Sequence, residues 1–281
     1  MKTSDLKLRP KLFFKEALLF AATLALGIFT AYRYSLVSIE AIQLPELRLS
    51  FWDFLILAVV VLFFVFAPKY KKIANFSFKF FLILIVFAGS QIITGALLNP
   101  PFNLIVVFGI ILVFIFFKNV LVHNIGVILG VAGISSILGL AISPKTAVLL
   151  LIAFSFYDIL SVYVTGHMVS MARNMIESGA PFGFIVPSEG SSFLRSRSEA
   201  NTKIGNQFMI LGSGDVGLPL ILACSLAGLY LSEAVIVGIF SLAGLFLTHL
   251  IFINQKIRKP MAALPPIATM AIVGYLIVLL R

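Results

Sequence analysis

Residues 144–166 read PKTAVLLLIAFSFYDILSVYVTG, and this stretch decides the fold because it is long, apolar and interrupted by one carboxylate, Asp158. About 20 predominantly apolar residues are enough for a helix to cross the roughly 30 Å hydrocarbon core of a bilayer. Of the 281 residues of the whole chain, 60% are apolar and 11% are charged, whereas about a quarter of the residues of a soluble domain are charged. The sequence therefore predicts an integral membrane protein with the lipid bilayer as its main solvent.

Nine apolar stretches follow one another, which predicts an all-α membrane protein, a bundle of nine transmembrane helices forming one transmembrane domain over residues 1–281. Most connections are a few residues long, so consecutive helices are expected to be antiparallel neighbours. The first stretch exceeds the apolar region of a typical signal peptide and is expected to be retained. The predicted spans are residues 13–32, 51–67, 79–98, 101–117, 121–141, 144–166, 207–230, 232–253 and 261–280.

One connection departs from this pattern. Residues 167–206 separate the sixth span from the seventh and are rich in Ser, Gly and charge, a composition that favours disorder. A solvated tether and a lid over a site between the two helices are both compatible with it. The apolar patch APFGFIV at residues 180–186 fits either interpretation.

The basic residues, which produce a net charge of +10, are distributed unevenly between the two sides of the predicted bundle. If the spans alternate in direction, all but four of the 21 Lys and Arg residues lie on the side of the amino terminus. The positive-inside rule then predicts a multi-pass protein of the cell membrane with a cytosolic amino terminus and an extracytosolic carboxyl terminus. Topology explains the basic balance, and no nucleic-acid partner is expected.

Two of the eleven acidic residues, Asp158 and Asp215, lie well inside predicted spans. A carboxylate at the centre of a membrane helix costs about 2.5–3.5 kcal/mol on insertion scales, so such a residue is a functional candidate. Each Asp stands eight residues from the cytosolic end of its span. At 1.5 Å of rise per residue, both would lie roughly 12 Å inside that face on antiparallel helices. The two carboxyl groups are therefore expected to meet.

Two carboxyl groups that meet in a low-dielectric site do not readily ionise together, so they tend to share one proton. That state suits hydrolysis, because the ionised group draws a proton from water while the protonated group donates a hydrogen bond to the scissile carbonyl. A proton- or ion-coupled transporter could use the same pair. The two carboxylates alone do not separate these functions.

The surroundings of the two carboxylates favour proteolysis. Tyr157 precedes Asp158, and in the stretch ILGSGDVGLPL at residues 210–220 two glycines, Gly212 and Gly214, precede Asp215. Glycine removes side-chain bulk, which lets a substrate backbone or a neighbouring helix approach the carboxylate.

The ninth span begins KPMAALPPIATM at residues 259–270. Its adjacent prolines, Pro265 and Pro266, are compatible with an ordinary helix start. They are also compatible with an irregular segment, Ala263-Leu264-Pro265, that presents backbone groups toward a wet cavity. This motif taken alone favours the ordinary helix start.

Together, the Tyr-Asp pair on the sixth span, the Gly-x-Gly-Asp on the seventh and the Ala-Leu-Pro on the ninth resemble the presenilin and signal peptide peptidase family of intramembrane aspartyl proteases. The resemblance covers the whole nine-helix plan. It implies that Asp158 and Asp215 are the catalytic pair and that the segment Ala263-Leu264-Pro265 helps to form the active site and to engage substrate. One position departs from the family motif, because Ala262 stands where a proline is usual. Tyr157, Gly212 and Gly214 complete the expected substrate-binding residues.

The resemblance also suggests a substrate class. The predicted orientation is similar to that of presenilin, which implies that the substrates are single-pass transmembrane proteins of type I. No metal and no cofactor are expected, because His123, His167 and His249 are scattered and no H-E-x-x-H motif is present. The sequence shows no Ser motif paired with a His, so it does not favour a serine protease. Prepilin peptidases, which look like Gly-x-Gly-Asp membrane proteases without the helix-nine motif, are the nearest alternative, and the oligomeric state is not predicted.

Overall fold

The predicted apolar stretches form helices wherever the structure, a computed structural model, describes them. It describes residues 9–41, 71–188, 192–202, 207–228, 230–255 and 260–280. The predicted second span, residues 51–67, lies outside the described residues. Helices suit a lipid environment because they satisfy every backbone N–H and C=O group within one segment. The apolar helices are α1 (Pro10–Ala41), α3 (Lys71–Leu97), α4 (Phe102–Phe116), α5 (Val120–Ala141), α6 (Pro144–Ile159), α9 (Ser213–Ala227), α10 (Leu231–Ile253) and α11 (Leu264–Leu279).

Five segments of the described chain are long and apolar enough to cross a membrane. They lie in α1, α3, α5, α6 with the turn that continues it, and α10. The helices α4, α9 and α11 are apolar but shorter, at 15, 15 and 16 residues. The described residues therefore form a mostly helical membrane protein, and the count of nine spans stays a prediction.

The predicted seventh span, residues 207–230, is wrong in its first turn and a half. Residues Phe208–Gly212 form a strand, β2, and the helix α9 begins only at Ser213. The strand pairs antiparallel with β1 (Gly183–Pro187), with Gly183 opposite Gly212. A short apolar run such as Phe-Met-Ile-Leu has no periodicity that separates strand from helix, so only the partner strand decides its structure.

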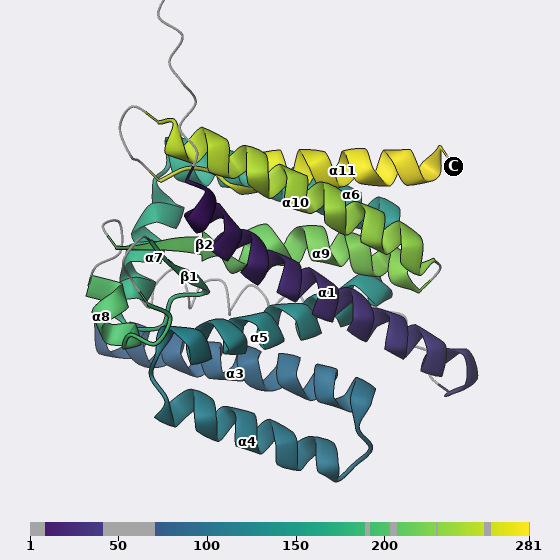
Figure 1. The fold of residues 1–281 in the computed structure, drawn as a ribbon, viewed down its shortest axis with the longest axis horizontal. Coiled ribbons are helices and arrows are strands. Elements are labelled where there is room, and N and C mark those ends of the chain that lie inside the picture. The colour runs from purple at the N-terminus through teal and green to yellow at the C-terminus, as the bar shows by residue number, and fades with distance from the viewer. Residues whose placement is uncertain are drawn as a thin grey trace, which may run out of the picture.

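The connection at residues 167–206, whose composition favours disorder, is largely ordered where the structure describes it. It contains a helix, α7 (His167–Glu177), then β1, and then a short helix, α8 (Arg197–Thr202). The apolar patch at residues 180–186 explains the order, because Phe184, Ile185 and Val186 are fully buried. Figure 1 shows that α7, α8 and the sheet gather at one end of the bundle, opposite the carboxyl terminus.

The sheet end of the bundle is also where α9 and α11 begin. In Figure 1, β2 leads directly into α9, and α11 lies beside α10. Close backbone approach joins α10 to α11, because a Cβ added at Gly244 would lie 2.6 Å from the Cα of Ile267. The helix α6 contacts both α9 and α11.

Candidate active site

Asp158 lies in the last turn of α6 and is 4% exposed. Its Oδ2 accepts a hydrogen bond from the backbone N–H of Leu264, with the two atoms 3.2 Å apart. Leu264 is the first residue of α11, and the N–H groups of a first helical turn have no partner within their own helix. The carboxyl group of one helix thus satisfies the free N–H at the start of another.

A π-helical turn, η2 (Leu160–Val164), continues α6 and begins two residues after Asp158. The hydroxyl of Ser161 in this turn donates to the backbone carbonyl of Asp158 at 3.2 Å. Single π-turns inside α-helices are rare and are frequent at functional sites. The widened turn sets the direction in which the chain leaves the Asp158 side of the site.

Asp215 lies in the first turn of α9 and is 9% exposed. The sequence placed it eight residues inside a helix, so its predicted depth along α9 is wrong, because β2 occupies the preceding residues. The positive end of a helix dipole favours a carboxylate at this position. Pro219 lies within α9 one turn later, as the sequence indicates.

The two glycines before Asp215 have different surroundings. A Cβ added at Gly212 would lie 2.7 Å from Oδ2 of Asp215, whereas a Cβ added at Gly214 would meet nothing within 4 Å. Gly212 has extended backbone angles that any residue adopts, so space rather than conformation requires glycine there. A side chain at position 214 would instead point into open space.

The two carboxyl groups belong to one site. Asp158 and Asp215 interact electrostatically, and both are buried. The helices that carry them are in contact, and α11 contacts both helices. The helices that carry the two acids are therefore neighbours. Asp215 is not eight residues inside its helix, because α9 begins only at Ser213.

The start of α11 is irregular up to Leu264. Residues 260–263 have no helical structure, and Pro265 and Pro266 stand in the first turn of the helix. The predicted ninth span at residues 261–280 therefore starts three residues too early. Ala262, at the position where the family motif usually has proline, is buried, and the Leu264 N–H beyond it is the backbone group that reaches Asp158.

Tyr157 faces away from the two acids. Its side chain is 55% exposed, whereas that of its neighbour Asp158 is buried. Adjacent residues of an α-helix point about 100° apart, so a Tyr-Asp pair on a helix at the edge of a bundle places one side chain outward and one inward. The structure therefore does not bring Tyr157 into the cluster formed by the other site residues.

The sheet beside Asp215 has one edge covered by side chains. The carboxamide of Asn124 donates to the Ile185 carbonyl and accepts from the Ile185 N–H, both at 2.8 Å. The ring of His123 contacts the Gly183 carbonyl at 3.0 Å, and Lys15 donates to the Pro187 carbonyl at 2.9 Å. These contacts occupy the backbone groups of β1 that point away from β2.

The other edge of the sheet is free within the described residues. The Ser188 N–H donates to the Gln207 carbonyl, so Ser188 and Gln207 are a hydrogen-bonded pair. Hydrogen-bonded and non-hydrogen-bonded pairs alternate along an antiparallel sheet, so the N–H and C=O groups of Phe208 and Ile210 point away from β1. No hydrogen bond joins these outward groups to another described residue. This open edge runs along the chain toward Asp215.

Sequence reasoning missed a buried pair of polar side chains. Nδ1 of His249 on α10 lies 2.8 Å from Oε2 of Glu16 on α1, and the two residues are 3% and 2% exposed. The sequence placed Glu16 near a span end and His249 among scattered histidines, and no local pattern connects residues 233 positions apart. The pair fixes α10 against α1.

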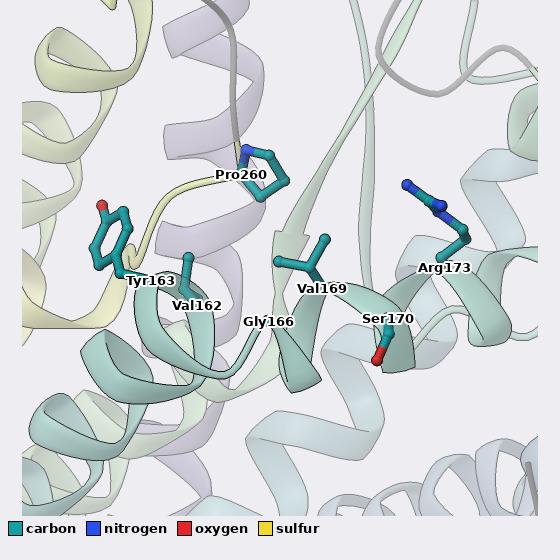
Figure 2. A pocket seen from close by; sticks show the side chains of 7 residues that line it. All are labelled: Val162, Tyr163, Gly166, Val169, Ser170, Arg173 and Pro260. Atoms are coloured by element: carbon teal, nitrogen blue, oxygen red, sulfur yellow. The ribbon is translucent and has the colours of Figure 1, made fainter.

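A pocket of about 520 Å³ opens next to the site. Figure 2 shows Tyr163 and Arg173 on opposite sides of it and Pro260 between them, and none of the residues that line the pocket is one of the two acids. Pro260 precedes the start of α11, and Tyr163 belongs to the turn that follows Asp158. The pocket thus lies near Asp158, at the same end of the bundle as the sheet. Its lining residues are Val162, Tyr163, Gly166, Val169, Ser170, Arg173 and Pro260.

Comparisons with known proteins identify the family of this chain and its fold. Residues 38–281 match the family described as signal-peptide peptidase, presenilin aspartyl protease. Two solved structures, both of a presenilin family intramembrane aspartate protease and determined in space groups C222 and P2, share 23% sequence identity with this chain. They cover 95% and 94% of this chain and each is covered to 96%, with TM-scores of 0.56 and 0.60. No curated protein matches the sequence.

Proposed function

We propose that this chain, which belongs to the signal-peptide peptidase and presenilin family of aspartyl proteases, cleaves peptide bonds inside transmembrane segments with Asp158 and Asp215 as its catalytic pair. The observation that carries this proposal is the convergence of two buried, interacting carboxyl groups from α6 and α9 at the irregular start of α11. The family match gives no support to a prepilin-peptidase-like enzyme or to a transporter.

The pair acts by general acid and base catalysis. One carboxylate takes a proton from a water molecule, whose oxygen attacks the scissile carbonyl carbon, while the protonated partner donates a hydrogen bond to the carbonyl oxygen. The proton then reaches the leaving nitrogen and the C–N bond breaks. The Leu264 N–H holds one oxygen of Asp158, which leaves the other oxygen of that carboxyl group for water or substrate.

The substrate reaches this pair as an extended segment. A transmembrane helix hides its carbonyl groups in internal hydrogen bonds, so it must unwind before hydrolysis. The free edge of β2 offers outward backbone groups at Phe208 and Ile210, and an unwound segment adds to such an edge as a strand. A Cβ added at Gly214, the residue before Asp215, would meet open space, which leaves room for such a segment near the carboxyl group. Tyr157, exposed on α6, contacts the arriving helix on the lipid side.

The surrounding topology follows the charge distribution. The chain crosses the cell membrane nine times, with a cytosolic amino terminus and an extracytosolic carboxyl terminus. The sheet, α7 and the pocket then lie at the cytosolic end. Single-pass transmembrane proteins of type I are the substrates in this orientation.

A cleavage assay tests the proposal. Wild-type protein reconstituted in liposomes with a single-pass substrate is expected to cut it, whereas Asp158→Asn and Asp215→Asn should each lose cleavage and keep the wild-type unfolding temperature. Glu233→Gln is the matched control, because Glu233 is also an acidic residue in the first turn of an apolar helix. Cleavage that survives in either Asn variant would remove that residue from the mechanism.

A further inference from the structure

The peptide group between Ala263 and Leu264 is hydrogen-bonded on both sides. Its N–H, which belongs to Leu264, donates to Oδ2 of Asp158 at 3.2 Å. Its C=O, which belongs to Ala263, accepts from the hydroxyl of Thr248 at 3.3 Å. A peptide group is planar and trans, so its N–H and C=O point in opposite directions. Thr248 on α10 and Asp158 on α6 therefore hold the two ends of one rigid unit.

We propose that Thr248 is a positioning residue for the catalytic carboxyl group of Asp158, acting through this one peptide group. The inference rests on the proposed function, in which Asp158 is a member of the catalytic pair. Thr248 itself does not touch the carboxylate. It fixes the plane of the peptide group whose N–H donates to the carboxylate.

The hydrogen bond from Thr248 to Ala263 is not needed to complete α10. Thr248 has the back-bond common for Thr in a helix, because its hydroxyl also lies 3.0 Å from the Gly244 carbonyl one turn earlier. The hydroxyl has one hydrogen, which these two carbonyls share. The contact with Gly244 lies within α10, whereas the contact with Ala263 contributes nothing to the formation of that helix.

The position of Thr248 is held from two directions. Gly244, one turn earlier, allows the backbone of α11 to approach, since a Cβ there would lie 2.6 Å from the Cα of Ile267. His249, the next residue, is hydrogen-bonded to Glu16 and anchors this level of α10 to α1. The hydroxyl of Thr248 is thus presented to the start of α11 at a fixed place.

The consequence for catalysis is orientation. The peptide group before Leu264 stands at the boundary of α11, next to residues 260–263, which are not helical. With the Thr248 hydroxyl in place, rotation would break bonds at both ends. Hydrogen bonds in a chain also polarise one another, so the bond to the carbonyl strengthens the N–H as a donor. Without the hydroxyl, the Leu264 N–H is no longer held in one orientation, so it no longer fixes the position of Oδ2 of Asp158.

A substitution series separates this role from a general effect on α10. Thr248→Val keeps the shape and removes the hydroxyl, and should lower kcat about tenfold, the effect of one net hydrogen bond lost in the transition state. KM should stay within about twofold of wild type, because binding that is equal in ground and transition states is untouched. Thr248→Ser, which restores the hydroxyl, should return kcat to within about twofold of wild type.

Ser241→Ala is the matched control. Ser241 is a buried residue of the same helix whose hydroxyl donates only to the Val237 carbonyl one turn earlier, at 2.8 Å. Its loss should leave kcat unchanged. If Thr248→Val matched wild type in kcat, or if Ser241→Ala lost as much, the inference would be overturned. If Thr248→Val fails to fold, the ratio of kcat between Thr248→Ser and Thr248→Ala replaces it as the test.

Asp158→Asn is assayed in parallel and keeps the two levels of the proposal apart. An inactive Asp158→Asn together with a fully active Thr248→Val would leave the catalytic pair standing and remove only the role of Thr248. An active Asp158→Asn would contradict the proposed function itself, whatever Thr248→Val does.

Discussion

The two buried acids look alike in the sequence and differ in the structure. Asp158 lies in the last turn of α6, and the N–H of Leu264 from another helix holds its Oδ2. Asp215 lies in the first turn of α9, directly after a strand, and the backbone of Gly212 lies against its carboxyl group. One carboxyl group is positioned by a helix start across the bundle, and the other by its own chain.

This difference indicates how the two sides of the site respond to change. On the Asp215 side, a Cβ added at Gly212 would lie 2.7 Å from Oδ2 and displace the carboxyl group, which also has a hydrogen bond with the Gly212 backbone. The Asp158 side depends on hydrogen bonds at 3.2 and 3.3 Å, which weaken gradually. Substitutions on the Asp215 side are therefore expected to cause the larger losses.

The largest effect is expected from Gly212→Ala. The new Cβ would lie 2.7 Å from Oδ2 of Asp215, so the carboxyl group must move. A displacement of about 1 Å in a catalytic group costs on the order of a hundredfold in rate, and kcat should fall by that amount. Gly109→Ala on α4 is the control, since a Cβ there meets nothing within 4 Å. A Gly212→Ala enzyme with wild-type kcat would show that the Asp215 side is not sterically fixed.

The next effect concerns the sheet that precedes Asp215. Asn124→Leu leaves the N–H and C=O of Ile185 without their partner, and the free energy of unfolding in detergent should drop by about 1–3 kcal/mol per unsatisfied group. Asn103→Leu is the comparison, because the buried Asn103 accepts only from the neighbouring Leu104 N–H. Equal losses in the two variants would mean that Asn124 does not hold β1 in place.

A smaller effect is expected from Gly214→Ala. The added methyl group points into open space, since a Cβ there meets no atom within 4 Å outside its chain neighbours and the backbone of its own helix. It should therefore obstruct substrate and raise KM severalfold while kcat changes little, as for the loss of binding shared by ground and transition states. Steady-state kinetics with a reconstituted substrate give both constants. A fall in kcat as large as that of Gly212→Ala would contradict this, because it would show that Gly214 positions the carboxyl group of Asp215.

The smallest effect is expected from Tyr157→Phe. The side chain is 55% exposed and faces away from the acids, so removal of its hydroxyl should change kcat and KM by no more than about twofold. The same assay measures it. A loss near that of Asp158→Asn would mean that Tyr157 turns inward when substrate is bound and belongs to the site after all.

Much of the helical fold could be predicted from the sequence, and so could the candidate pair of acids. Apolar length identifies the helices, and the energetic cost of a carboxylate in lipid singles out Asp158 and Asp215 among eleven acidic residues. The start of α9 could not be placed, because the run before Gly212 is as apolar as a helix and its strand partner begins at Gly183. Local patterns carry no information about that pairing.

Contacts between distant residues were equally out of reach. The bond from the Leu264 N–H to Asp158 joins a backbone group to a side chain 106 positions away, and a backbone group has no signature in sequence. The pair of Glu16 and His249 spans 233 positions. The order within residues 167–188 was missed for the same reason, since buried Phe184 and Val186 gain their environment from helices elsewhere in the chain.

The most direct test of the central claim measures whether both acids bind one transition state. A substrate peptide whose scissile bond is replaced by a hydroxyethylene group mimics the tetrahedral intermediate, and such mimics bind at least about a hundredfold more tightly than substrates. Wild-type protein is expected to bind it, and Asp158→Asn and Asp215→Asn are each expected to bind it at least about a hundredfold more weakly while unfolding at the wild-type temperature. Binding as tight as wild type in either variant would contradict a site built from the two carboxyl groups together.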